Sequence, residues 1–96
     1  MRYFLELRYD GAAYCGWQRQ PDQPSVQQTL ERALATLLRE SIEVVGAGRT
    51  DTGVNASYYV AHFDTVKSVA DPVQTVYKLN FLLPGSIAVA SVTPVA

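Results

Sequence analysis

An arginine, a threonine and an aspartate stand between glycines in the segment Gly48–Gly53, which reads GRTDTG. Asp51 follows Arg49 by two residues, and a nearby cation favours the ionised form of a carboxylate. An ionised and oriented carboxylate can act as a nucleophile or as a base. The glycines allow a tight turn and let a bulky ligand approach the backbone closely. This pattern predicts a site of nucleophilic or acid-base chemistry at Asp51.

The same six residues have two other interpretations. Gly, Asp and Thr also build ordinary connections that contain an Asx-type hydrogen bond, and on spacing alone this interpretation is the commoner one. A phosphate-binding loop made of these glycines would need a helix to begin directly after it. Residues 55–64 have the pattern of a strand instead, which argues against the phosphate-binding loop.

Composition narrows the class of protein. The chain has 96 residues, 48% of them hydrophobic and 18% charged, as expected for one globular domain. A single cysteine, Cys15, excludes an internal disulfide, and the charges at Arg2, Glu6 and Arg8 interrupt any apolar stretch of the kind found in signal peptides. No apolar run reaches the length that spans a bilayer. We therefore expect a cytoplasmic protein with no membrane partner.

The charge balance limits nucleic-acid binding by this chain alone. Eight basic and nine acidic residues give a formal net charge of −1. Phosphate contacts supply most of the affinity of nucleic-acid binders, so a free-standing RNA-binding module is disfavoured. Arg8 and Arg19 stand at the two ends of a loop, where a phosphate contact and a solvated charge are equally good interpretations. An RNA partner would require further basic surface from elsewhere.

Six segments have the periodicity of regular elements. Ser25 with Gln28 has the form of a capping box, and Asp71 before Pro72 is a natural helix start. Helices are predicted at 25–40 and 71–82, and strands at 3–9, 42–47, 56–63 and 87–92. This β-α-β-β-α-β order predicts an α+β, ferredoxin-like fold, a four-stranded antiparallel sheet with two helices on one face.

Four segments of the chain carry a resemblance to a known family. GRTDTGVNA at residues 48–56 resembles the GRTDAGVHA signature of the TruA family of bacterial tRNA pseudouridine synthases. YDGAAYCGWQRQP at 9–21 resembles the YDG-x-x-(Y/F)-x-GWQ-x-Q segment of the same family. SVQQTLERAL at 25–34 is similar to its first helix, and KLNFLLPGSIAV at 78–89 is similar to its LN-x-x-LP-x-DIAV segment. The resemblance therefore covers essentially the whole chain.

The resemblance implies an isomerase and assigns roles to individual residues. Asp51 matches the catalytic aspartate, here assigned as the nucleophile, and Arg49 matches the arginine that pairs with it and helps displace the target base. Thr50, Gly53 and Arg19 are assigned to substrate binding. The family converts uridine to pseudouridine in the anticodon stem-loop of tRNA, at tRNA positions 38 to 40, without a metal or an organic cofactor. The residues leave open whether the carboxylate attacks the sugar, attacks the base or removes a proton.

Several residues near Asp51 depart from the family pattern. Thr52 replaces a usual Ala, Asn55 replaces a usual His, and Tyr58 and Tyr59 replace a common Gly-Gln pair. These changes bear on local geometry more than on the type of reaction. Ordinary sheet packing explains at least one of the two tyrosines better than base stacking, so neither is assigned to the site.

The family implies a larger protein than this one. Its members are more than twice as long, with a second half that repeats the architecture. We therefore expect residues 1–96 to be a single domain, the N-terminal half of a longer synthase that forms a homodimer, and to be inactive alone. The alternatives are a structural or dimerisation half-domain and a noncatalytic RNA-binding module, which would show exposed aromatic residues on its two central strands.

Overall fold

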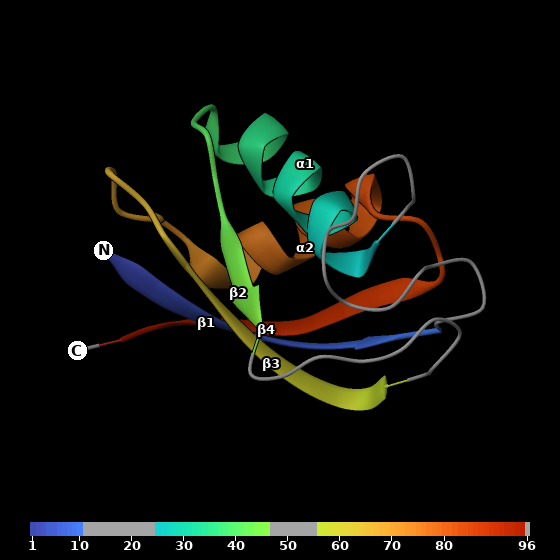
Figure 1. The fold of residues 1–96 in the computed structure, drawn as a ribbon. Coiled ribbons are helices and arrows are strands. Elements are labelled where there is room, and N and C mark those ends of the chain that lie inside the picture. The colour runs from blue at the N-terminus through green and yellow to red at the C-terminus, as the bar shows by residue number, and fades with distance from the viewer. Residues whose placement is uncertain (11–24, 47–55, 96) are drawn as a thin grey trace.

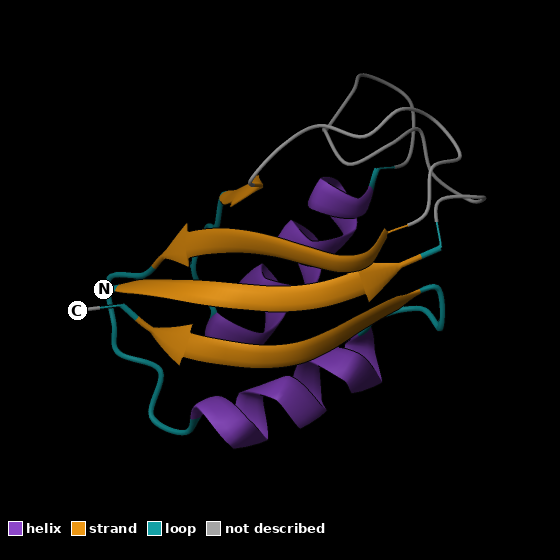
Figure 2. Ribbon diagram, turned by 90° about the horizontal axis from the view of Figure 1, so that it is seen from below, coloured by secondary structure: helices purple, strands orange, loops and turns teal. Residues whose placement is uncertain are grey.

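The computed structural model describes residues 1–10, 25–46 and 56–95. The elements are β1 (Arg2–Tyr9), α1 (Val26–Leu38), β2 (Val44–Gly46), β3 (Ala56–Asp64), α2 (Pro72–Leu82) and β4 (Ile87–Pro94). The strands form one antiparallel sheet in the order β2-β3-β1-β4. Both helices lie on one side of this sheet (Figure 1), and no described element covers the other face (Figure 2). The expected ferredoxin-like fold is confirmed.

Strand β1 lies in the centre of the sheet and supplies alternate side chains to the core. Leu5 is opposite Ala61 of β3 on one side and Val92 of β4 on the other. Successive side chains of a strand point to opposite faces, so one face of β1 is buried against the helices. The inward positions expected from the alternating pattern are confirmed: Tyr3, Leu5, Leu7 and Tyr9 are all buried.

Helix α1 begins as expected and ends earlier. Ser25 accepts a hydrogen bond at Oγ from the backbone N–H of Gln28 (3.1 Å), which satisfies one of the free donors of the first turn. The predicted end at residue 40 is wrong, because Arg39 adopts the left-handed conformation (φ 56°, ψ 40°). The Arg39 N–H then donates to the carbonyl of Ala35 (2.9 Å), which closes the last turn of the helix.

Helix α2 has the predicted limits and is joined to β4 by a side chain. Asp71 accepts at Oδ1 from the N–H of Gln74 (3.1 Å), and Pro72 occupies the first helical position. Near the other end, the Asn80 amide bonds both backbone groups of Val89, at 2.9 Å to its carbonyl and 2.8 Å from its N–H. These two hydrogen bonds fix α2 against β4.

Strands β2 and β4 differ in length from the prediction. Strand β2 starts at Val44 rather than at residue 42, and Ile42 is buried without pairing. Strand β4 continues to Pro94, two residues further than predicted, because its end pairs with Tyr3 of β1. Residue 47, the predicted last residue of the short strand, lies outside the described residues.

Candidate functional site

The residues assigned to the site from sequence lie outside the described part of the chain. The structure does describe the two strands next to the GRTDTG segment: Gly46 ends β2 and Ala56 begins β3. These strands are neighbours in the sheet, with Gly46 opposite Ala61. The roles of the assigned residues stay predictions; those residues are Arg19, Arg49, Thr50, Asp51 and Gly53.

The described residues that flank both motif segments lie at one end of the sheet. Tyr9, at the end of β1, is opposite Ala56, at the start of β3. The next residue, Asp10, donates its N–H to the carbonyl of Ser86, just before β4 (2.8 Å). Figure 2 shows the end of β1 between the starts of β3 and β4. This end of the sheet is therefore where the chain enters the first motif segment and leaves the second.

Two buried tyrosines join β1 to β3 at this end. The rings of Tyr9 and Tyr59 meet edge to face, with centroids 5.9 Å apart and planes at 71°. Such aromatic pairs stabilise a structure beyond the area that they bury. Tyr59 is thus a packing residue, which confirms sheet packing as the interpretation of one of the two adjacent tyrosines. Tyr58 lies on the other face, where its side chain is 66% exposed.

Two polar side chains of α1 position the strand that precedes GRTDTG. Gln27 donates from Nε2 to the carbonyl of Val44 (2.7 Å), and Glu31 accepts at Oε2 from the Val44 N–H (2.8 Å). Strand β2 is an edge strand, and these contacts satisfy the backbone N–H and carbonyl of Val44. Neither residue was expected from the sequence to have this role. The available signal was that Gln27 and Glu31 are four residues apart, so they share one side of the helix next to the apolar positions Val26 and Leu30.

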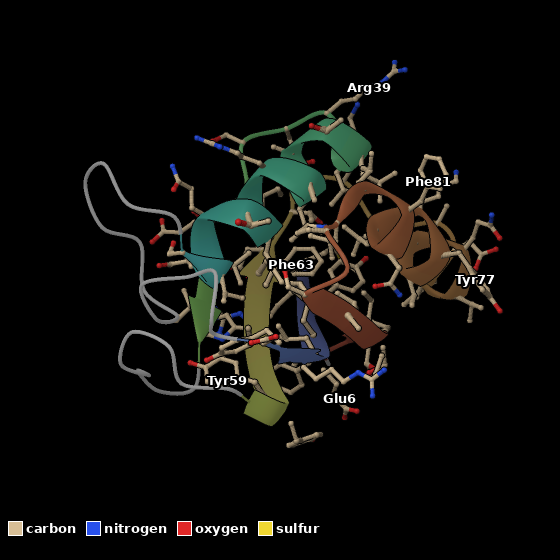
Figure 3. The ribbon with its side chains drawn as sticks, turned by 90° about the vertical axis from the view of Figure 1, so that its right-hand side faces the viewer. Glu6, Arg39, Tyr59, Phe63, Tyr77 and Phe81 are labelled. Atoms are coloured by element: carbon tan, nitrogen blue, oxygen red, sulfur yellow. The ribbon has the colours of Figure 1, made fainter. Side chains whose placement is uncertain are left out.

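The uncovered face of the sheet holds Arg8, for which the sequence allows a phosphate contact, and other residues to which the sequence patterns assigned no role in the site. Glu6 and Arg8 of β1 and Tyr58 of β3 line a hollow of about 310 Å³ together with residues of β4. Figure 3 shows Glu6 on the side of the sheet away from the helices. Phe4 of β1 is also exposed, at 44%. Exposed aromatic residues thus occur on both central strands, as an RNA-binding module of this architecture would require.

The charges on this face are partly paired. Arg2 donates from Nε to Oδ1 of Asp64 (2.8 Å) and from Nη2 to Oδ2 (3.1 Å). The hydrogen bond from Arg2 lowers the pKa of Asp64, and the same bond raises the pKa of Arg2. Arg8 is exposed and forms no ion pair with any described residue. It is therefore available to an external anion.

Among the residues that the structure describes, no helix is long and apolar enough to cross a membrane. Within the same residues, His, Cys, Asp and Glu side chains do not gather in groups of three or more that could hold a metal ion.

Comparison with known proteins identifies the family. The family model described as tRNA pseudouridine synthase matches residues 7–96. The chain is 55% identical over 94 residues to tRNA pseudouridine synthase A of Bacteroides thetaiotaomicron, a match that covers 98% of this chain and 35% of that protein. The protein of the same name from Parabacteroides distasonis is 50% identical, over 98% of this chain and 37% of its own length. The one from Colwellia psychrerythraea is 54% identical, over 99% of this chain and 36% of its own length. The chain thus spans little more than a third of these relatives, and it belongs to the tRNA pseudouridine synthase family.

Proposed function

We propose that residues 1–96 are the aspartate-bearing N-terminal part of a longer tRNA pseudouridine synthase. The substrate is uridine in the anticodon stem-loop of tRNA, and the longer enzyme is a cytoplasmic homodimer. The observation that carries the proposal is the family match over residues 7–96, within which Asp51 and Arg49 keep the residues of the GRTDAGVHA signature.

The proposed chemistry needs a carboxylate and a displaced base. The bond between C1′ of the ribose and N1 of the uracil breaks, the uracil turns, C1′ joins C5, C5 loses its proton, and N1 gains one, so the product is an isomer of the substrate. Asp51 is the carboxylate that attacks the sugar or the base, or accepts that proton. Arg49 keeps Asp51 ionised and occupies the space from which the target nucleotide leaves its stack. Thr50, Gly53 and Arg19 contact the substrate, and no cofactor enters the scheme.

The described fold supports this proposal by holding both ends of segment 47–55. Val44, shortly before the segment, is bound by Gln27 and Glu31, and the start of β3 is held by the contact between Tyr9 and Tyr59. Catalytic groups are effective when the elements that carry them are held in one geometry. The regular elements on both sides of Asp51 meet this requirement.

A chimeric enzyme tests the proposal. Residues 1–96 replace the matching 35% of the Bacteroides thetaiotaomicron protein, and tritium release from tRNA labelled at C5 of uridine is measured. We expect the chimera to be active and Asp51→Asn to lower turnover by roughly 10³-fold or more while tRNA binding remains, because only the chemical step uses the charge.

Asp71→Asn is the matched control, because asparagine also caps helices and Asp71 lies at the start of α2. If the Asp51→Asn chimera turned over at a near wild-type rate, the assignment of Asp51 as the catalytic carboxylate would be refuted. A chimera that binds tRNA and forms no pseudouridine would favour the noncatalytic RNA-binding alternative, which the exposed Phe4 and Tyr58 support.

A further inference from the structure

The hollow on the uncovered face lies between irregularities in two strand pairings. The register of β1 with β4 shifts between Glu6 and Leu7, which leaves Ala90 as an extra residue on β4. The register of β1 with β3 shifts between Leu7 and Tyr9, beside Tyr58. Bulges of this kind re-aim side chains and are over-represented next to active sites. Both shifts border the same hollow of about 310 Å³.

Tyr58 presents an aromatic surface to this hollow. Its side chain is 66% exposed, whereas the next residue, Tyr59, is buried. The neighbours across the hollow are the small residues Ala88 and Ala90. Alanine side chains are too short to cover an aromatic ring, so a flat ligand has access to it. Unpaired RNA bases characteristically stack on exposed aromatic side chains.

Arg8 and Glu6 add two polar groups with different preferences. Arg8 is exposed and forms no ion pair within the described residues, whereas Arg2 on the same strand is bound to Asp64. A free guanidinium suits a phosphate oxygen. The Glu6 carboxylate is an acceptor, which suits the N–H groups on the edge of a base. The hollow thus offers Tyr58 to the face of a base, Glu6 to the edge of that base and Arg8 to the phosphate of the same nucleotide.

We propose that Glu6, Arg8 and Tyr58 form a subsite for one unpaired nucleotide of RNA. The base stacks on Tyr58, its edge donates to Glu6, and Arg8 binds its phosphate. The subsite rests on the proposed function in taking a nucleotide of the tRNA substrate.

Binding of an unmodified anticodon stem-loop RNA to the chimeric enzyme tests the subsite. Tyr58→Ala should raise Kd roughly ten-fold, within the range measured for loss of one stacked base, and Tyr58→Phe should preserve binding because the ring remains. Arg8→Gln should weaken binding and reduce the slope of log K against log salt by about one, the effect of losing one phosphate contact.

Two matched variants lie away from the hollow. Tyr77 of α2 is exposed to the same degree as Tyr58, and Figure 3 shows it pointing outward from the helix. Arg32 is an exposed arginine of α1. Tyr77→Ala and Arg32→Gln should leave Kd unchanged. The subsite would be overturned if Tyr58→Ala bound the RNA with the Kd of the wild type, or if Tyr77→Ala raised Kd as much as Tyr58→Ala does.

The chimeric enzyme separates this proposal from the proposed function. An active chimera in which Tyr58→Ala changes neither Kd nor KM would refute the subsite and leave the function standing. An inactive chimera whose RNA binding still depends on Tyr58 and Arg8 would refute the function and support the subsite. Circular dichroism of each variant tests whether the fold is intact, and a loss of binding by a folded variant is assigned to the side chain.

Discussion

At the scale of single residues, the contacts of α1 with Val44 tie a helix to the strand before the candidate site. Gln27 and Glu31 are polar yet nearly buried, at 9% and 8% exposure. Buried polar groups are stable when they are hydrogen-bonded, and both of these reach the backbone of one residue. The helix therefore helps to hold β2 in place, together with the pairing of β2 with β3.

Removing one of these contacts should destabilise the chain measurably. Glu31→Ala leaves the Val44 N–H without this acceptor inside the protein, and we expect the free energy of unfolding to fall by about 1–3 kcal/mol. Urea denaturation measures the change. The exposed neighbour Arg32→Ala serves as the control. Equal stability of Glu31→Ala and the control would show that this contact contributes nothing.

The ion pair of Arg2 with Asp64 should make stability depend on acid pH. The hydrogen bond from Arg2 lowers the pKa of Asp64 in the folded state. The contribution is therefore present above the unfolded value, about 3.9, and is lost as the pH falls through the folded value. Both groups are exposed, so the effect is small and weakens in salt.

Urea midpoints of the wild type and Asp64→Asn check this dependence. The wild type should have the higher midpoint at pH 7, and the difference should shrink as the pH falls through the folded pKa of Asp64 and the carboxyl becomes protonated. A difference that keeps the same size as the pH falls would contradict the ion pair as its source.

At the scale of elements, both helices start with a side-chain cap and differ in their outer faces. Ser25 and Asp71 supply the caps. Along α2, Val73, Tyr77 and Phe81 recur every fourth residue and are exposed, and Figure 3 shows the last two directed away from the protein. The described residues leave this row uncovered, while on the other side of α2 Leu79 is buried and Asn80 bonds β4.

The cap of α2 should be worth a definite amount of stability. Asp71→Ala removes the acceptor of the Gln74 N–H, and we expect a loss of about 1 kcal/mol in the free energy of unfolding. Asp71→Ser keeps an acceptor and should retain most of the stability. Thermal denaturation of the wild type and the two variants provides the measurement. Equal melting temperatures of Asp71→Ala and the wild type would contradict a stabilising role of the cap.

At the scale of the whole molecule, this chain alone should not perform the proposed reaction. It has a net charge of −1 and spans little more than a third of its relatives. Positioning of reacting groups is worth up to roughly 7–11 kcal/mol in well-ordered sites, and a catalytic aspartate without the rest of the enzyme loses most of it. We expect no detectable pseudouridine and only weak, salt-sensitive binding of tRNA.

Chemical mapping of pseudouridine in unmodified tRNA, incubated with the purified chain, measures this outcome. Light scattering in parallel gives the mass of the species present. Stoichiometric modification by the chain alone would show that residues 1–96 contain a complete active site.

Local patterns in the sequence determine most of the fold. The alternation along β1 and the caps at Ser25 and Asp71 are encoded by neighbouring residues, so the elements and their order follow from the sequence. The end of α1 does not follow from the sequence. Arg39 adopts the left-handed conformation there, whereas glycine is the residue that usually marks such a helix end. Asp51 and the other assigned residues are identified by resemblance, and their roles stay predictions.

Only the tertiary structure decides which polar groups form hydrogen bonds between distant segments. Glu31 and Val44 are 13 positions apart, and neither their spacing nor their types encode the hydrogen bond between them. The same holds for Tyr58: two adjacent tyrosines have the same strand propensity, and pairing with β1 and packing under the helices bury Tyr59 and expose Tyr58. Such choices depend on contacts between distant segments, which local periodicity does not specify.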